Sequence, residues 1–200
     1  MTTKETRRGR GRPRTVDRER AVDSVMMLWW RDGLRARSLN QLCREAGLSK
    51  PALYREFGGE DGWMTAALER YREVVLAPLL QALAADQPFG ELLDSVLVYM
   101  TSERETPAGC LFTRMRLEPD HLGPLALEAT RAIEAERLEA FASWYRRGLE
   151  AGEANPSLSP ELAARYLDGQ LTLVLAQLTA GADSLQQREQ ARLACRALLR

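Results

Sequence analysis

The stretch that decides the fold is Ala46-Gly47-Leu48-Ser49-Lys50-Pro51-Ala52-Leu53-Tyr54. Gly47 can adopt the left-handed conformation that ends a helix, and Ser49 has a hydroxyl that can cap the next helix. Leu48 stands between them and is expected to point inward, so the turn is too short for anything but a steep crossing of two helices. This spacing predicts a helix-turn-helix.

The second helix of this pair carries Lys50, Tyr54 and Arg55 on its polar side. These residue types hydrogen-bond phosphates and base edges in the DNA major groove. An alternative is that Tyr54 is a core side chain with an incidental hydroxyl, and that Lys50 and Arg55 are merely solvated charges. Because all three stand on a helix that begins immediately after the turn, we favour contacts with DNA.

Two more helices are expected before the turn. From Asp17 onward apolar residues recur at helical spacing, which predicts a first helix that ends at Gly33. Ser38 followed by Gln41 resembles a capping box and predicts the start of a second helix. The core of the unit is expected to contain Trp29, Leu48, Leu53 and Phe57. We therefore expect a three-helix DNA-binding domain over residues 16–58.

Residues 1–15 are rich in arginine and contain almost nothing apolar, so we expect a basic arm that is disordered in the free protein. Within it Gly11-Arg12-Pro13-Arg14 is similar to the core of an AT-hook, in which arginines lie in a narrow A·T-rich minor groove. Arg12 and Arg14 are therefore candidate DNA contacts. The reading that we favour is a tail that only adds non-specific affinity.

Charge is distributed unevenly along the 200 residues, although the formal net charge is zero. Residues 1–60 hold 14 Lys and Arg against 8 Asp and Glu, so the remainder is acidic by the same margin. A basic first part attracts phosphates, and an acidic remainder keeps the rest of the surface off DNA. This division is typical of a two-part regulator.

Several other classes of protein are disfavoured by the sequence. There is no apolar run long enough to span a membrane and no secretory signal, so we expect a cytoplasmic protein without a membrane partner. Cys43, Cys110 and Cys195 are widely spaced, which does not suggest disulfides. With His121 as the only histidine, neither a histidine-dependent triad nor a two-histidine zinc site is expected. We predict a protein that is not an enzyme and that has no cofactor or metal site.

The rest of the chain, residues 59–200, is expected to be all-α, since no strand pattern occurs in it. Pro78 is expected to kink the first of its helices. Loop-like segments occur at residues 106–109 and 118–120, and Asn155 and Pro156 mark a break. The helices are predicted over residues 60–85, 89–105, 121–152, 159–181 and 184–199.

The helix at residues 159–181 contains a nearly uninterrupted apolar run from Leu171 to Leu178. A helix that is apolar on all sides needs cover on more than one face, and this chain offers few partners for it. Pairing the last two helices with those of a second copy would supply the cover and would set two reading heads a fixed distance apart. We therefore expect a homodimer, with a buried helix in a monomer as the alternative.

The segment Ser38-Leu39-Asn40-Gln41-Leu42-Cys43-Arg44-Glu45-Ala46-Gly47-Leu48-Ser49-Lys50-Pro51-Ala52-Leu53-Tyr54-Arg55-Glu56-Phe57 resembles the tetracycline-repressor (TetR/AcrR) family of bacterial regulators. The resemblance implies about nine helices per subunit, with an N-terminal DNA-binding domain and a C-terminal ligand-binding and dimerisation domain. It also implies a homodimer that represses a promoter from a pseudo-palindromic double-stranded operator until a small-molecule inducer binds. The alternative is an architectural protein that needs no ligand and uses its arm in A·T-rich minor grooves.

Site residues follow from the resemblance position by position. It implies that Ser38 and Tyr54 touch phosphates and that Lys50, Pro51 and Ala52 face base edges. Ser49, the predicted cap, belongs to the same DNA-binding surface, with further backbone contacts expected from Arg37, Arg44 and Arg55. Family members often have a phosphate-binding lysine at the start of the fourth helix, whereas this chain has Glu60 and Asp61 there.

The inducer cavity implied by the resemblance should be lined by apolar and aromatic residues of the C-terminal helices. The candidates are Phe89, Tyr99, Met100, Cys110, Phe112, Met115, His121, Trp144, Tyr145 and Tyr166. Cys110, in a Gly-Cys-Leu sequence, also resembles a cysteine with which part of the family senses electrophiles or oxidants. For Cys110 we favour the alternative of an inert buried thiol.

Overall fold

Helices make up the regular structure of the part of the chain that the computed structural model describes, residues 17–85 and 87–200. Arg12 and Arg14 lie outside these residues. The prediction of an all-α fold is confirmed, and counting α4 and α5 as one continuous rod gives nine helical rods among the described residues. The elements are α1 (Arg18–Asp32), α2 (Leu39–Glu45), α3 (Lys50–Phe57), α4 (Glu60–Tyr71), α5 (Ala77–Ala82), α6 (Phe89–Thr101), α7 (Leu111–Leu117), α8 (Pro124–Glu150), α9 (Pro160–Thr179) and α10 (Ser184–Cys195).

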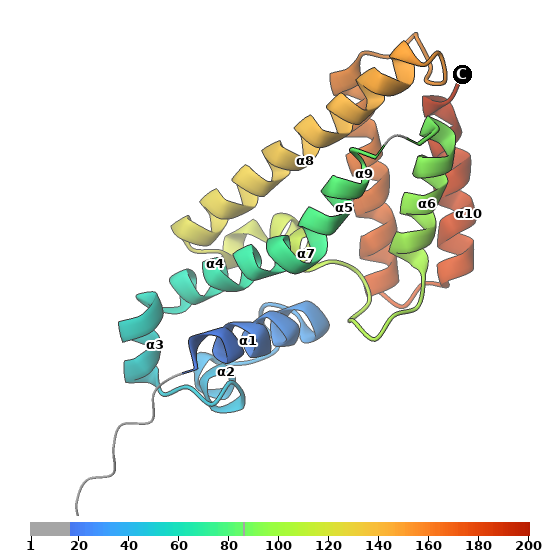
Figure 1. The fold of residues 1–200 in the computed structure, drawn as a ribbon. Coiled ribbons are helices and arrows are strands. Elements are labelled where there is room, and N and C mark those ends of the chain that lie inside the picture. Colours follow the sequence, from blue (N-terminus) through green and yellow to red (C-terminus); the bar gives the residue numbers. More distant parts are fainter. Residues whose placement is uncertain (1–16, 86) are drawn as a thin grey trace, which may run out of the picture.

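The helices form two parts. Figure 1 shows α1, α2 and α3 as a small head at one end, with α4 and α5 running away from it along α8. At the far end α6, α9 and α10 complete a larger bundle, which we call the sensor part, residues 59–200. No helix among the described residues is both long and apolar enough to cross a membrane.

Local signals in the sequence set the ends of the head helices. The Asp17 carboxylate accepts a hydrogen bond from the Arg20 N–H and so caps α1. The capping box predicted at the start of α2 is present, with the Ser38 N–H donating to Gln41 Oε1 at 2.8 Å. Gly47 has a φ of 66°, in the left-handed region, and so allows the short turn before α3. The predicted helix-turn-helix is confirmed.

The core of the head continues beyond the three helices into α4. Trp63 of α4 lies edge-on to Trp29 with ring centroids 5.8 Å apart and stacks on Phe57 at 6.0 Å. Leu48 and Leu53 are buried in the same core, as predicted. Because α4 supplies the large ring that α1 and α3 share, the head and the start of α4 pack as one unit.

Pro78 changes the hydrogen bonding of the long helix without breaking it. A π-helical turn, Arg72–Leu76, joins α4 to α5, and the Ala77 N–H donates to the carbonyl of Arg72, five residues back. Proline has no N–H to donate, so a regular α-helical pattern cannot continue through this position. The extra residue per turn absorbs the defect.

The sensor part contains a buried ionic cluster of Arg116, Arg137 and Asp168, contributed by α7, α8 and α9. The Arg137 side chain is 2% exposed and its Nη2 lies 2.9 Å from Asp168 Oδ1. Arg116 binds the other carboxylate oxygen of Asp168. Burial lowers the pKa of Arg116, but the hydrogen bonds and charge attraction to Asp168 and Glu134 together outweigh it, so the net pKa shift is upward. The cluster therefore joins α7, α8 and α9 through one carboxylate that two guanidinium groups contact.

Several predicted helix boundaries differ from the structure by a few residues, and two of them have a clear local cause. The helix expected over residues 89–105 ends at Thr101, because Ser102 turns to extended backbone and begins a loop that reaches to Cys110. The helix expected from residue 121 begins at Pro124, after a short 3-10 turn, Pro119–His121. Proline fits the first turn of a helix, where its missing N–H has no partner to lose.

Candidate nucleic-acid interface

One face of α3 is exposed and polar. Lys50, Pro51, Tyr54 and Arg55 are all exposed, and the Tyr54 side chain is 58% exposed. On the opposite face Leu53 and Phe57 are buried, which fixes the rotation of the helix. The alternative in which the Tyr54 ring belongs to the core is therefore excluded. An exposed row of this kind presents donors along a helix of a size that fits the major groove.

Ala52 is a correction to the sequence analysis. Its side chain is only 5% exposed and packs in the core of the head, so it does not face outward with Lys50 and Pro51. Ala52 lies on the same side of the short helix as Leu53. Because alanine is small and only weakly apolar, the sequence did not indicate whether Ala52 faces the core or the solvent. Its role is to pack α3, and its N–H is bound at 3.3 Å by the Ser49 hydroxyl, which caps the helix.

The Tyr54 ring rests against the turn that follows α3. Gly58 adopts a left-handed φ of 74°, and its N–H donates to the Tyr54 carbonyl at 3.0 Å. A Cβ at Gly59 would lie 3.4 Å from Cε1 of the Tyr54 ring. Because Gly59 has no side chain, the Tyr54 ring can pack against its backbone, with the Tyr54 hydroxyl facing outward.

The three other predicted contacts in α2 and its approach are accessible to different degrees. Ser38 and Arg44 are exposed. Arg37 is half-buried and paired, with Nη1 2.6 Å from Asp32 and Nε 2.9 Å from Glu45. With Arg31, it holds the pKa of the Asp32 carboxyl below its usual range. Arg37 would have to exchange these carboxylates for a phosphate before it could bind DNA.

The acidic start of α4, where the resemblance suggests a lysine, connects the end of α4 that packs with the head to α8. Asp61 accepts hydrogen bonds from the N–H groups of Leu125 (3.0 Å) and Ala126 (2.9 Å) at the N-terminus of α8. A Cβ at Gly123 would lie 2.3 Å from the Asp61 carboxyl carbon. Asp61 is thus a carboxylate cap for a helix of the sensor part, a role that the sequence analysis missed.

Replacing Asp61 by alanine is expected to lower the free energy of unfolding by about 1–2 kcal/mol, because two N–H groups of α8 lose their acceptor. Asp61→Asn keeps one carbonyl oxygen and should lose less. Circular dichroism during denaturant unfolding, at one fixed protein concentration, measures both. An Asp61→Ala variant as stable as the unsubstituted chain would contradict this role for Asp61.

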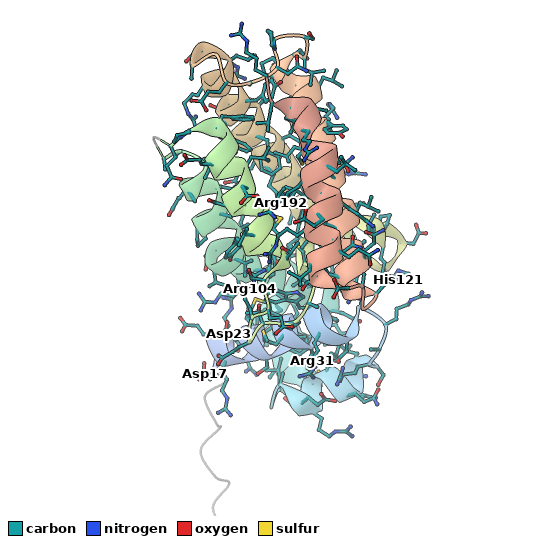
Figure 2. All side chains as sticks on the ribbon, turned by 90° about the vertical axis from the view of Figure 1, so that its right-hand side faces the viewer. Asp17, Asp23, Arg31, Arg104, His121 and Arg192 are labelled. Atoms are coloured by element: carbon teal, nitrogen blue, oxygen red, sulfur yellow. The ribbon has the colours of Figure 1, made fainter. Side chains whose placement is uncertain are left out.

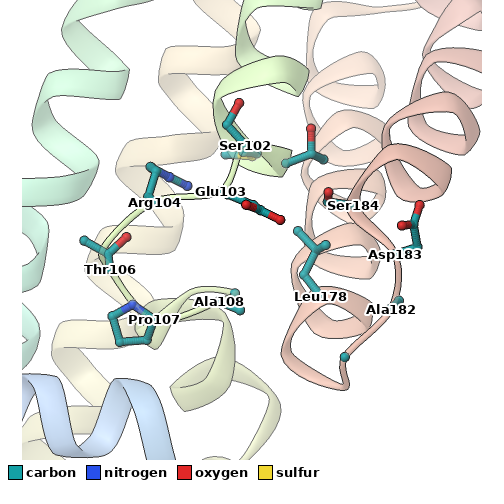
Figure 3. Close-up of a pocket in the computed structure, with 14 residues that line it drawn as sticks. Ser102, Glu103, Arg104, Thr106, Pro107, Ala108, Leu178, Ala182, Asp183 and Ser184 are labelled. Atoms are coloured by element: carbon teal, nitrogen blue, oxygen red, sulfur yellow. The ribbon is translucent and has the colours of Figure 1, made fainter.

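Within the part of the chain that the structure describes, candidate ligand residues border three different hollows. Phe89 and Trp144 border a hollow of about 290 Å³, Met100 borders a polar hollow of about 540 Å³, and Tyr99 borders an apolar hollow of about 240 Å³. Figure 3 shows the 540 Å³ hollow, with Arg104 on the loop at one side and Asp183 and Ser184 at the other. His121 is half-buried, and its Nδ1 lies 3.8 Å from Glu118.

Four of the remaining candidates have structural partners that explain their burial. The hydroxyl of Tyr145 donates to the Asn155 carbonyl at 2.8 Å, and that of Tyr166 to the Ala194 carbonyl at 2.9 Å. The guanidinium of Arg137 covers the ring of Phe112 at 4.8 Å, and Met115 is fully buried. Cation–π contact and dense packing account for both.

The three cysteines are buried and free. Burial raises the pKa of Cys43, and it raises that of Cys195 to about 11, so neither thiol favours the reactive thiolate. Cys110 occupies the N-cap of α7, where its sulfur accepts from the Thr113 N–H at 3.4 Å. Its place at a helix N-terminus keeps both interpretations of Cys110 open.

An exposed polar face on the second helix of a helix-turn-helix, attached to a larger helical bundle, defines a class of protein: a DNA-binding regulator with a separate C-terminal part. The profile described as "Bacterial regulatory proteins, tetR family" matches residues 22–62, which span the helix-turn-helix.

Curated relatives and solved structures agree with this class. The chain is 32% identical over 148 residues to the HTH-type transcriptional repressor ComR of Escherichia coli K12, and the match covers 70% of this chain and 70% of ComR. It is also 32% identical over 110 residues to the repressor BdcR of the same organism, covering 55% of this chain and 56% of BdcR. The CifR regulator, solved with 26bp operator DNA, superposes with a TM-score of 0.80 at 24% identity, over 94% of this chain and all of that one. The reduced form of NemR from E. coli superposes with a TM-score of 0.79 at 18% identity, over 92% of this chain and 96% of NemR.

The chain therefore belongs to the TetR family and is a DNA-binding transcriptional regulator that recognises double-stranded DNA.

Proposed function

We propose that this regulator is a homodimeric repressor that binds a pseudo-palindromic operator and leaves it when a small molecule binds the sensor part. The observation that carries the proposal is the exposed face of α3, with Lys50, Pro51, Tyr54 and Arg55 outward and Leu53 and Phe57 inward. The relatives ComR and BdcR are named as repressors, which supports this direction of control. Family membership does not favour the architectural alternative.

Residues of the head are assigned roles according to their exposure. Lys50 and Pro51, at the N-terminus of α3, would meet base edges, and Tyr54, Ser38 and Arg44 would bind phosphates. Arg55 already pairs with Glu56 at 2.9 Å, so it would serve as a phosphate contact of lesser weight. Ser49 would hold α3 in place through its cap. Arg12 and Arg14 would add affinity that depends on salt concentration.

Exposed leucines on α9 and α10 support a dimer through these two helices. Leu162 and Leu173 of α9 and Leu185 and Leu193 of α10 are all more than half exposed. Gly169 lies on the same face of α9 as Leu162 and Leu173, and a Cβ there would meet nothing within 4 Å. A glycine in an exposed helix interior costs about 1 kcal/mol relative to alanine. We infer that Gly169 marks the close approach of α9 from a second copy.

Contacts between α7 and α1 offer a route from the sensor part to the head. Arg114 of α7 donates from Nη2 to the Trp30 carbonyl, at 3.4 Å, in the last turn of α1. A Cβ at Gly33, just after α1, would lie 3.0 Å from Arg114 Nη1. A ligand that shifts α7 would therefore shift α1 and change the distance between the two heads of a dimer.

The proposal predicts that small molecules which stabilise the protein also release its DNA. A ligand that binds the DNA-free form raises the melting temperature of the protein. If it prefers that form, it also lowers the affinity for the operator, and the operator lowers the affinity for the ligand by the same factor. A thermal-shift screen of small molecules would identify such ligands. Fluorescence anisotropy with labelled DNA from the region upstream of the gene would then measure release, and footprinting would count the protected sites.

We expect one protected pseudo-palindrome, and its loss on addition of the stabilising compounds. Protection of many A·T-rich tracts with equal strength, unaffected by any stabilising compound, would instead support the architectural alternative. An unrelated duplex of equal length serves as the control for non-specific binding.

A further inference from the structure

An apolar hollow of about 240 Å³ lies between α5 and α6. Pro78, Leu79 and Ala82 of α5 form one wall, and Leu92, Val96 and Tyr99 of α6 form the other. Ligand pockets are concave and mostly apolar with a few polar groups, and they measure roughly 300–1,000 Å³. This hollow is slightly smaller than that range, so it suits only a small ligand.

The irregular hydrogen bonding of the long helix is located beside this hollow. Pro78 is a wall residue, and the π-helical turn Arg72–Leu76 ends two residues before it. Turns of this kind occur frequently at functional sites, because they displace the helix beyond them. Ala82, one turn after Pro78, is exposed and has a side chain too small to fill the space towards α6.

Arg104 supplies a positive charge next to this hollow, because it stacks on the wall residue Tyr99, although Arg104 itself lines the neighbouring 540 Å³ hollow. Its guanidinium carbon lies 4.2 Å from the centre of the Tyr99 ring. Within residues 17–85 and 87–200, no carboxylate lies within ion-pairing distance of Arg104. The neighbouring acid on α6, Asp94, is already bound by Arg192 at 2.6 and 3.0 Å. A guanidinium that stacks on an aromatic ring keeps its N–H donors at its edge, available to an anion.

We propose that this hollow binds a small amphipathic carboxylate, with the apolar body between α5 and α6 and the carboxylate group on Arg104. Arg104 is exposed, so water binds its guanidinium when no ligand is present. A carboxylate forms a stronger, charge-assisted hydrogen bond with it than a neutral group does, and an amine would meet a like charge. The proposal deepens the proposed function, on which it rests, by naming the chemical class of the ligand.

The position of Arg104 connects the hollow to the head. Figure 2 shows Arg104 at the end of the sensor part that lies beside α1. Arg104 stands in the loop between α6 and α7, whose Gly109 is pressed against α9, where a Cβ would lie 3.0 Å from the Leu175 carbonyl. The next residue, Cys110, caps α7, and α7 contacts α1 through Arg114. A carboxylate that draws Arg104 towards the hollow would thus displace α7.

Calorimetric titration of the full chain with octanoate, octan-1-ol and octylamine tests the assignment. Octanoate should bind roughly tenfold more tightly than octan-1-ol, as expected of a charge-assisted hydrogen bond, and octylamine more weakly than both. Arg104→Gln should lower the affinity for octanoate to that for octan-1-ol, and it should leave the affinity for octan-1-ol unchanged. Ala82→Trp, which fills the hollow from an exposed position, should weaken both.

Arg131→Gln is the matched control, because it removes an exposed arginine of α8 that does not line the hollow. It should bind all three compounds as the unsubstituted chain does. Equal affinity for octanoate and octan-1-ol, the same octanoate affinity after Arg104→Gln, or no binding of octanoate would each overturn the assignment. Operator binding in the presence of octanoate separates the two proposals: octanoate that binds through Arg104 without releasing DNA upholds the site and contradicts the proposed release.

Discussion

Alanine at both Lys50 and Tyr54 is expected to lower operator affinity about a thousandfold. Each lost base or phosphate contact costs about 1–3 kcal/mol, and a dimer loses four of them, so the total is about 4 kcal/mol or more. Both side chains are exposed on α3, so the head should fold as before. Fluorescence anisotropy with the operator duplex, at several salt concentrations, measures the effect.

The single variants distinguish base contacts from phosphate contacts. Lys50→Ala should change which operator bases are preferred, whereas Tyr54→Ala should weaken all sequences alike. Arg31→Ala is the matched control, since Arg31 is an exposed arginine of the head that lies on α1 and pairs with Asp32 at 3.0 Å. Operator affinity that is unchanged in the double variant would refute the assignment of α3 as the reading helix.

Leu173→Glu is expected to split the dimer and, with it, to reduce operator affinity about a thousandfold. A charge placed in an apolar interface destabilises the dimer. The resulting monomer has only one head, so it cannot also bind the second half-site, which lies about 34 Å from the first. Specific binding exceeds non-specific binding by at least about this factor. Sedimentation equilibrium gives the mass, and anisotropy gives the affinity.

Leu125→Glu is the control, because Leu125 is 54% exposed, much as Leu173 is, but lies at the start of α8. It should leave the mass and the operator affinity unchanged. Gly169→Ala adds a second test of the same interface. In a monomer the substitution would stabilise α9, since nothing lies within 4 Å of the new Cβ, whereas in the proposed dimer it should weaken association. A Leu173→Glu protein that stays dimeric would refute the interface through α9.

The sequence by itself determined the head. Gly47, Ser49 and the Ser38–Gln41 box act within a few residues of their own position, so the turn and the helix starts follow from local chemistry. The exposed row of Lys50, Tyr54 and Arg55 follows from helical periodicity in the same way. The family resemblance, which the comparisons confirm, rests on this segment.

Only the tertiary structure decided the rest. Ala52 has a side chain that suits either face of a helix, and packing turned it inward. The structure also pairs residues that are far apart in the sequence, such as Asp61 with Ala126 and Arg116 with Asp168. No local sequence pattern predicts such pairs. Aromatic residues of the sensor part are equally suited to a core and to a cavity wall. Which role each one takes depends on how the helices pack, because burial is a property of the assembled bundle.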